Sequence, residues 1–423
     1  MNTAIHYNEY ISILKEELIP AMGCTEPIAI AYAGAKAREI LGTIPDKVHI
    51  EVSGNILKNV KSVVVPHTGG LRGIPAAAAI GIVAGNAEKE LEVLSHITEK
   101  QIEETKLFIE KTPISVHFAD TPHIFDIMIT LSKGDESAFV RLAEHHTNIV
   151  CIKKNSEVLF EKEVAPQENG LTDHSVLSIE EIISFAESAE LGTLKDTLER
   201  QISFNMAIAE EGLKGNYGAN IGSTLLSHGK PDIYQKMRAY AAAGSDARMN
   251  GCEMPVIICS GSGNQGITAS VPLIVYAQEK GYEREELLRA LIVSNLVTVH
   301  LKAGIGRLSA YCGVVSAAVG AAAGVAFLKG GRYDTIAHTV VNALAMDSGI
   351  ICDGAKASCA AKIASAVDAG LLGLFMYENG NQFYSGEGLV AKGVENTIRN
   401  IGSLARNGMA ETDKEIIRIM LES

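Results

Sequence analysis

The chain has 423 residues, of which 47% are hydrophobic and 21% charged, a balance typical of a folded protein and not of a disordered one. The 50 acidic residues outnumber the 37 basic ones and give a net charge of -13, so we expect no nucleic-acid partner, which would need clustered Lys and Arg. A single hydrophobic core would be at its upper size limit in a chain of this length, so two domains are expected.

The first part of the chain is predicted to mix helices with strands. Apolar spacing predicts a helix at residues 10–18, a second helix from Thr25 with Thr25 as its N-cap, an Ala-rich helix at 74–83 and a further helix at 137–145. Strand composition is found at residues 47–52, 61–65, 114–118, 124–131, 148–153 and 156–160, with the first two about one hairpin apart. Asn155 can supply the turn between the last two of these strands.

From residue 178 onward the pattern is helical, and residues 165–170 contain the chain breakers of a linker. We therefore expect an α+β fold with an N-terminal mixed α/β domain at 1–174 and a mainly helical, Ala/Gly-rich domain at 175–423. Helical spacing is present at 179–186, 194–210, 233–243, 284–302, 316–328, 333–345 and 357–376.

Two long uncharged segments raise the question of a membrane. Residues 308–328 are dominated by Ala, Gly, Val and Ser, and residues 254–278 contain a Gly-rich stretch and Pro272. An aromatic belt flanks neither segment, so we interpret both as buried parts of a soluble core and expect no membrane partner.

The cysteines indicate a reducing compartment. The N-terminus has no apolar signal segment, and the number of cysteines is odd. We therefore expect a cytoplasmic protein whose cysteines are thiols or metal ligands and not disulfides. The seven cysteines are Cys24, Cys151, Cys252, Cys259, Cys312, Cys352 and Cys359.

Three of these cysteines, Cys312, Cys352 and Cys359, lie in the helical half. On one continuous helix Cys352 and Cys359 would be about 10 Å apart along the axis, but a turn at Asp353-Gly354 would bring them together at the start of the next helix. The Cys-x-x-Cys pairs of zinc sites are absent. The sharper hypothesis is an iron–sulfur centre with three protein thiolates and one open iron; the alternative is three cysteines that pack as small hydrophobes.

Cys24 immediately precedes the helix expected from Thr25. The positive end of the helix dipole lowers the pKa of a thiol at that place, and a thiolate there could act as a base or a nucleophile. The alternative is a cysteine that packs at a turn.

Residues 261–266 match the pattern G-x-G-x-x-G and follow a strand-like segment at 256–259. A dinucleotide site also needs a strand after the next helix, whereas here that helix contains Pro272 and is followed by a second helix, so a Rossmann unit is excluded. The loop can still bind a carboxylate through backbone N–H groups and Ser and Asn side chains. Alternatively it is only a flexible connection.

A turn at residues 66–70 contains His67 between Pro66 and Thr68-Gly69-Gly70. Such a histidine can orient a substrate or move protons, although a lone histidine is more often part of the hydrogen-bonded structure.

These motifs together resemble the L-cysteine desulfidase family, which is related to the iron–sulfur L-serine dehydratases. The resemblance covers essentially the whole chain and rests on residues 22–27 (MGCTEP), 66–70 (PHTGG), 260–266 (SGSGNQG) and the three late cysteines. It implies that Cys312, Cys352 and Cys359 hold a 4Fe-4S cluster, that Cys24 is the catalytic base, that no pyridoxal phosphate is needed and that the protein is a homodimer. The residues that it implies for substrate binding are Thr25, Glu26, His67, Thr68, Ser260, Ser262, Asn264 and Gln265.

The reaction that this resemblance implies is α,β-elimination from L-cysteine to sulfide, ammonia and pyruvate. Dehydration of L-serine by the same cluster is the nearest alternative, because an open iron could also accept hydroxide. A non-catalytic protein that binds an amino acid or a small anion is a more distant alternative. An electron-transfer protein is disfavoured because only three cluster ligands are matched.

Overall fold

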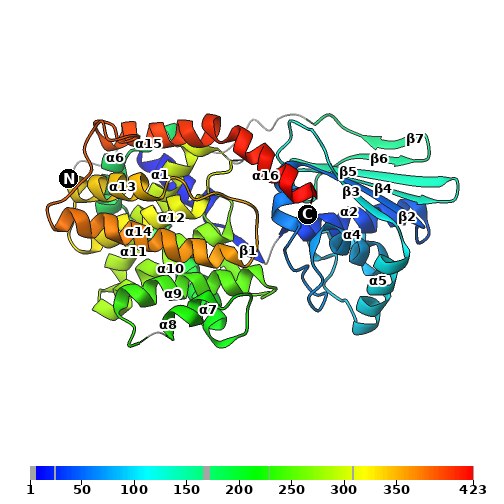
Figure 1. The fold of residues 1–423 in the computed structure, drawn as a ribbon, viewed down its shortest axis with the longest axis horizontal. Coiled ribbons are helices and arrows are strands. Elements are labelled where there is room, and N and C mark those ends of the chain that lie inside the picture. Colours follow the sequence, from blue (N-terminus) through cyan, green and yellow to red (C-terminus); the bar gives the residue numbers. More distant parts are fainter. Residues whose placement is uncertain (1–5, 23–24, 165–171, 228, 307–308, 423) are drawn as a thin grey trace. The chain divides into compact units, whose positions relative to one another are not determined.

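The computed structural model describes residues 6–22, 25–164, 172–227, 229–306 and 309–422 (Figure 1). The chain divides into two compact units. The helical unit comprises Met1–Met22, Asn169–Cys352 and Ala357–Lys414, and the sheet unit comprises Gly23–Glu168, Asp353–Lys356 and Glu415–Ser423.

The sheet unit is built on a six-stranded mixed sheet in the order β3-β2-β4-β5-β6-β7. Strands β2 and β3 are parallel, and all other neighbours are antiparallel. A chain that combines this mixed sheet with a mainly helical unit confirms the α+β fold. The strands are β2 (Lys47–Val52), β3 (Ile114–Phe118), β4 (Asp126–Lys133), β5 (Glu136–Ala143), β6 (Ile149–Lys154) and β7 (Glu157–Glu161).

One face of this sheet is covered by α2 (Thr25–Leu41) and α4 (Gly73–Ala84), as Figure 1 shows. Alternate residues of β2 are buried, which is the pattern of a strand with one face on a core. The two helices are rich in Ala and Gly and pack closely: a Cβ added to Gly34 in α2 would lie 2.9 Å from the carbonyl oxygen of Ala78 in α4. Small residues therefore set the spacing of this layer. The unit also contains α3 (Gly54–Val60), α5 (Glu99–Lys111) and the end of α16 (Ala410–Glu422).

Two segments of this unit were predicted with the wrong type of secondary structure. Residues 137–145, expected to be helical, form most of β5, whose buried residues Ala138, Val140 and Leu142 alternate with partly buried ones. Residues 61–65, expected to be a strand, contribute only one isolated bridge, between Val64 and Arg72. The reason is that α3 occupies the place where a hairpin was expected, so the apolar valines pack in a loop. The other expected strands are confirmed within two residues, and Asn155 adopts φ 54° in the turn before β7.

The helical unit confirms all seven helices expected after residue 178. At its centre α12 is surrounded by α10, α11, α13 and α14. Strands β1 (Pro20–Met22) and β8 (Pro255–Ile257) form a small antiparallel sheet. The helices are α1 (Tyr7–Glu17), α6 (Ile179–Ser188), α7 (Lys195–Lys214), α8 (Ile221–Leu226), α9 (Ile233–Met249), α10 (Gly263–Lys280), α11 (Arg284–Ile305), α12 (Gly313–Leu328), α13 (Tyr333–Asp347), α14 (Ser358–Glu378) and α15 (Val394–Ser403).

The division into units differs in two places from the boundary expected near residue 174. First, α1 belongs to the helical unit, because Tyr10, Ile13 and Leu14 are fully buried in its core and the Tyr10 hydroxyl donates a hydrogen bond of 3.0 Å to the carbonyl of Val176. Second, two short segments from the C-terminal half belong to the sheet unit. The linker expected at residues 165–170 lies outside the described residues.

Among the described residues, two helices are long and apolar enough to cross a membrane by length and composition, α11 and α14. Of their most apolar 18-residue windows, 72% and 50% respectively are buried inside the protein. Core helices of soluble proteins share these properties.

Asp246 in α9 is a fully buried carboxyl group that accepts a hydrogen bond of 2.9 Å from the backbone N–H of Gly222. Burial raises its pKa to about 6. Because the folded protein holds this proton more tightly than the unfolded chain, the associated stability is present at low pH and is lost as the pH rises through about 6.

We therefore expect the unfolding free energy of the wild type, relative to that of Asp246→Asn, to fall by about 1 kcal/mol between pH 5 and pH 7.5. Urea unfolding at the two pH values measures this difference, with Asp196→Asn on the exposed surface of α7 as the control. A difference between wild type and Asp246→Asn that does not change with pH contradicts the prediction.

Candidate active site

The structure brings Cys312, Cys352 and Cys359 together within the helical unit. Residues 310–312 pair antiparallel with residues 350–352, through backbone hydrogen bonds of 2.5 and 3.0 Å on the two sides of the bridge. In this register Cys312 and Cys352 are diagonal neighbours on one face of the short ladder. Cys359 is the second residue of α14, and the expected turn separates it from Cys352.

The three thiols interact with one another. The Cys312 side chain is hydrogen-bonded to Cys352 and interacts electrostatically with both Cys352 and Cys359. The hydrogen bond between the Cys312 and Cys352 side chains, together with burial, raises the pKa of the Cys312 thiol well above its usual range. A cation bound among these groups would reverse that preference and stabilise the thiolates.

Two helix N-termini point toward this cluster. Cys312 is the N-cap residue of α12, and Cys359 lies in the first turn of α14. The positive end of each helix dipole favours a thiolate at these positions. The local fold therefore stabilises negative charge where two of the three sulfur atoms are attached.

Whether these residues suit a metal group depends on its size. In the described part of the chain, no group of three or more His, Cys, Asp or Glu side chains is arranged to hold a single metal ion. A tetrahedral zinc ion needs sulfur atoms about 4 Å apart, whereas a cluster of several irons and sulfides is larger and takes thiolates that stand further apart. Cys352 and Cys359 are also half-exposed, unlike cysteines that only fill a core. The donor set fits an iron–sulfur cluster in type and number.

The turn between Cys352 and Cys359 is held by glycine. Gly354 has φ 93°, in the left-handed region, and its backbone lies directly against the carbonyl group of Lys58 in α3, where no Cβ fits. An ion pair of 2.6 Å between Lys356 and Asp353 closes the same turn. These contacts assign Asp353–Lys356 to the sheet unit.

The Gly-rich loop is a defined turn and not a flexible connection. Ser260 and Gly261 have φ 48° and 77°, and Cys259 and Ser262 exchange backbone hydrogen bonds of 3.2 and 3.1 Å. Two central residues with positive φ make a type I′ turn. Helix α10 begins at once after this turn and is followed by α11, so the exclusion of a Rossmann unit is confirmed.

Arg248, which no motif in the sequence identified as a site residue, lies at the N-terminus of α10. Its guanidinium group occupies the space beside Gly263 where a side chain would otherwise stand, and its Nη1 donates to Asn264 Oδ1 at 3.4 Å. The N-terminal amides of a helix and an arginine both attract carboxylates. In the sequence, the only signal was one arginine in an otherwise small-residue stretch of α9.

Gln265 lies in the first turn of the same helix and is only 6% exposed. A Cβ added to Gly313, the first residue of α12, would lie 2.6 Å from Gln265 Nε2 and 3.0 Å from Oε1, so the amide group lies next to the residue that follows Cys312. Gln265 Oε1 is buried and has no hydrogen-bond partner among the described residues. An unpaired buried acceptor costs about 1–3 kcal/mol, which a bound ligand can recover.

Buried amides hold the strand that leads into the Gly-rich loop. The Asn205 side chain in α7 donates a hydrogen bond of 3.1 Å to the carbonyl oxygen of Ile257 and accepts one of 2.8 Å from the N–H of the same residue. It thus pairs with Ile257 as a neighbouring β-strand would. It also donates to Ser270 in α10 at 2.9 Å. Asn205 thus fixes β8 and α10 on the two sides of the loop.

We expect Asn205→Leu to lower the unfolding free energy by about 2–4 kcal/mol, because it leaves both backbone groups of Ile257 buried and unpaired. Urea unfolding followed by circular dichroism measures the change, with the exposed Asn407→Ala as the control. Equal stability of Asn205→Leu and the wild type would contradict a structural role for this amide.

The remaining predicted residues lie in the sheet unit. Thr25 is the first residue of α2 and not its N-cap, and its hydroxyl is hydrogen-bonded to His146 Nε2 at 3.0 Å. Glu26 accepts a hydrogen bond of 3.3 Å from Asn59. Burial lowers the pKa of His146, and the nearby Glu26 acts in the opposite direction. His146 was missed, because nothing in its strand-end context distinguished it from the adjacent His145.

The turn at residues 66–70 has a structural component. The Thr68 hydroxyl is buried and donates a hydrogen bond of 2.6 Å to the carbonyl oxygen of Val65. His67 is exposed and has φ 59°. Cys24, the predicted base, lies outside the described residues. The described part of the predicted set thus falls into two groups, with the cysteines and the Gly-rich loop in one unit and Thr25, Glu26, His67 and Thr68 in the other.

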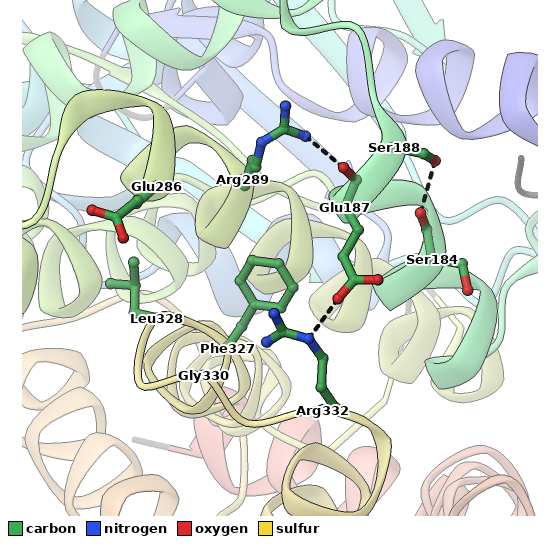
Figure 2. Close-up of a pocket in the computed structure, with 9 residues that line it drawn as sticks. All are labelled: Ser184, Glu187, Ser188, Glu286, Arg289, Phe327, Leu328, Gly330 and Arg332. Carbon is green, nitrogen blue, oxygen red and sulfur yellow. Dashed lines mark hydrogen bonds and ion pairs between the residues drawn. The ribbon is translucent and has the colours of Figure 1, made fainter. Parts of the chain in front are cut away.

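The helical unit also contains a pocket of 630 Å³ that is separate from the three cysteines and from the Gly-rich loop (Figure 2). Arg289 donates to the backbone carbonyls of Ala186, Glu187 and Ala189 at the end of α6, and Arg332 is ion-paired with Glu187. The charged groups of this pocket therefore serve to join helices. None of the predicted site residues lines the pocket.

Comparison with known proteins gives full-length relatives. The chain is 57% identical over 417 residues to a UPF0597 protein of Desulfitobacterium hafniense, covering 98% of this chain and 97% of the relative. It is 50% identical over 415 residues to a UPF0597 protein of Lachnoclostridium phytofermentans, covering 98% and 100%, and 46% identical over 423 residues to one of Treponema denticola, covering 98% of each.

The family comparison agrees with the geometry of the cysteine cluster. Residues 88–418, which include the Gly-rich loop and all three late cysteines, match the family described as serine dehydratase alpha chain. Members of this group are lyases associated with iron–sulfur centres. The chain belongs to the serine dehydratase alpha chain family.

Proposed function

We propose that this protein is an iron–sulfur lyase that converts L-cysteine to sulfide, ammonia and pyruvate by α,β-elimination. The observation that carries the proposal is the convergence of Cys312, Cys352 and Cys359 at the N-termini of α12 and α14. Membership of the serine dehydratase family supports a lyase. The choice of L-cysteine as substrate rests on the resemblance to L-cysteine desulfidases.

The three cysteines would hold a 4Fe-4S cluster, with no pyridoxal phosphate. When bound, this cluster would supply a Lewis-acidic iron that has no protein thiolate and stabilises the leaving group. Cys312 must lose its proton to become a ligand, so loading of the cluster releases protons and is favoured at higher pH.

The α-hydrogen of an amino acid is only weakly acidic, so the protein must activate it. A carboxylate held at the N-terminus of α10, beside Arg248, is partly neutralised, which makes the α-carbon more acidic. Cys24 is proposed as the base that takes the α-proton, since a thiolate is favoured where it precedes α2. Loss of sulfide leaves 2-aminoacrylate, which tautomerises to the imine and adds water to give pyruvate and ammonia.

Dehydration of L-serine is the second candidate, and the family match itself favours it. Steady-state rates of the anaerobically purified protein with each amino acid distinguish the two. The proposal predicts that kcat/KM for L-cysteine exceeds that for L-serine by at least about tenfold, which corresponds to about 1.4 kcal/mol. A preference for L-serine would make the protein a serine dehydratase. Binding of both amino acids without turnover of either would identify a binding protein.

We further propose that the protein acts as a cytoplasmic homodimer on a free amino acid. This part rests on the family resemblance and on the composition of the chain. Analytical ultracentrifugation of the anaerobic protein tests the oligomeric state.

A further inference from the structure

We propose that Gln265 binds the α-ammonium group of an amino-acid substrate whose carboxylate lies beside Arg248 at the N-terminus of α10. The substrate class, an α-amino acid, rests on the proposed function. The inference extends that function by assigning the two charged groups of the substrate to two different side chains.

The side-chain oxygen of Gln265 has unused hydrogen-bonding capacity. Among the buried amides of the helical unit, the side-chain oxygens of Gln201, Asn205, Asn295 and Asn342 all accept hydrogen bonds of 2.8 to 3.1 Å. Gln265 is also buried, at 6% exposure, yet its Oε1 has no partner in the part of the chain that the structure describes. Buried amide oxygens are normally paired, so this acceptor indicates a bound donor.

The position of Gln265 also favours a bound amino acid. Its amide lies against Gly313, the first residue of α12, and follows Asn264 in the first turn of α10. It is therefore flanked by the N-termini of two helices, and a helix N-terminus attracts a carboxylate. The adjacent cluster cysteine, Cys312, caps α12, so a ligand that contacts Gln265 is close to the proposed cluster.

The two side chains differ in the hydrogen bonds that they can form. Arg248 donates hydrogen bonds only, and it is placed beside Gly263 and bonded to Asn264. Gln265 offers an acceptor without a charge, and an ammonium group can only donate. The pair thus suits a ligand with adjacent negative and positive groups.

The test uses L-alanine and two analogues that each lack one of its charged groups; none has a β leaving group, so binding occurs without turnover. L-Alanine has both charged groups, propionate has only the carboxylate, and ethylamine has only the ammonium group. Their affinities for the anaerobic, cluster-loaded protein are measured by calorimetric titration. The proteins are the wild type, Gln265→Met, Gln265→Glu and Arg248→Met.

For Gln265→Met we expect the affinity for L-alanine to fall by about 10- to 100-fold, as for loss of a hydrogen bond to a charged group, while propionate binding changes by less than about twofold. Arg248→Met should weaken propionate and L-alanine alike. Gln265→Glu retains an acceptor and should bind ethylamine at least as well as the wild type. That retained binding also shows that substitution at this position does not unfold the site.

The inference is overturned if Gln265→Met weakens propionate as much as L-alanine, if it changes neither, or if the wild type does not bind L-alanine. Its fate is separate from that of the proposed function. If the expected binding pattern is found but L-cysteine and L-serine are not turned over, the lyase proposal fails and the recognition of an amino acid stands. If L-cysteine or L-serine is turned over but the expected binding pattern is not found, the lyase proposal stands and the role of Gln265 is refuted.

Discussion

Replacing Cys352 by alanine is expected to remove the iron–sulfur centre and with it the turnover of amino acids. The anaerobically purified variant should lack the brown colour, the charge-transfer absorption and the acid-labile sulfide of the wild type. Because loss of a residue that only supports a metal ligand typically lowers affinity or activity by about 10–100-fold, loss of a ligand itself should lower activity by more than about 100-fold. Cys352 is half-exposed and contributes its backbone to the ladder, so the fold should be retained.

The matched control for this experiment is Cys151→Ala. Cys151 is a buried free thiol in β6 of the sheet unit, and no part of the proposed site includes it. This variant should keep the iron, the sulfide and the activity of the wild type. Normal iron content and normal turnover in Cys352→Ala would exclude it as a cluster ligand.

Replacing Cys24 by alanine is expected to leave the cluster intact and to lower kcat by about 10²- to 10⁴-fold, the range typical for loss of a positioned general base. Iron content and absorption should equal those of the wild type. Exchange of the substrate α-hydrogen with deuterium from solvent should fall in parallel with kcat, because the same group removes that proton.

Cys24→Ser serves as the conservative comparison, since it keeps the size of the side chain but has a far less acidic hydroxyl group. It should be impaired nearly as much as Cys24→Ala. Full activity and full hydrogen exchange in Cys24→Ala would remove Cys24 from the mechanism and leave the cluster assignment unchanged.

Local patterns predicted most of the secondary structure. The helices after residue 178 and β2, β3, β6 and β7 were found where apolar spacing or β-branched composition indicated them. The strand β5 was mistaken for a helix because its Ala, Leu and Arg residues favour helices, and only pairing with β4 and β6 gives it an extended conformation. The valines at 63–65 were mistaken for a strand because burial in a loop selects the same residues as burial in a sheet.

The parts of the site that are formed by residues close together in the sequence could be predicted. The glycine turn beside Cys352 indicated how Cys359 returns to it, and the Gly-rich loop before α10 indicated a helix N-terminus. Arg248 and His146 could not be predicted, because each meets its partner only through tertiary packing. The isolation of the Gln265 amide oxygen is likewise a property of the packed structure, since it depends on Gly313 in a different helix.

The central claim is that the cluster held by Cys312, Cys352 and Cys359 is required for elimination from an amino acid. The most direct test is to reconstitute the protein anaerobically to a series of iron contents and to measure sulfide and pyruvate released from L-cysteine at each. We predict equal amounts of the two products, at a rate proportional to cluster content and zero without iron. A rate that is independent of iron, or no product from L-cysteine or L-serine at full loading, would contradict this account.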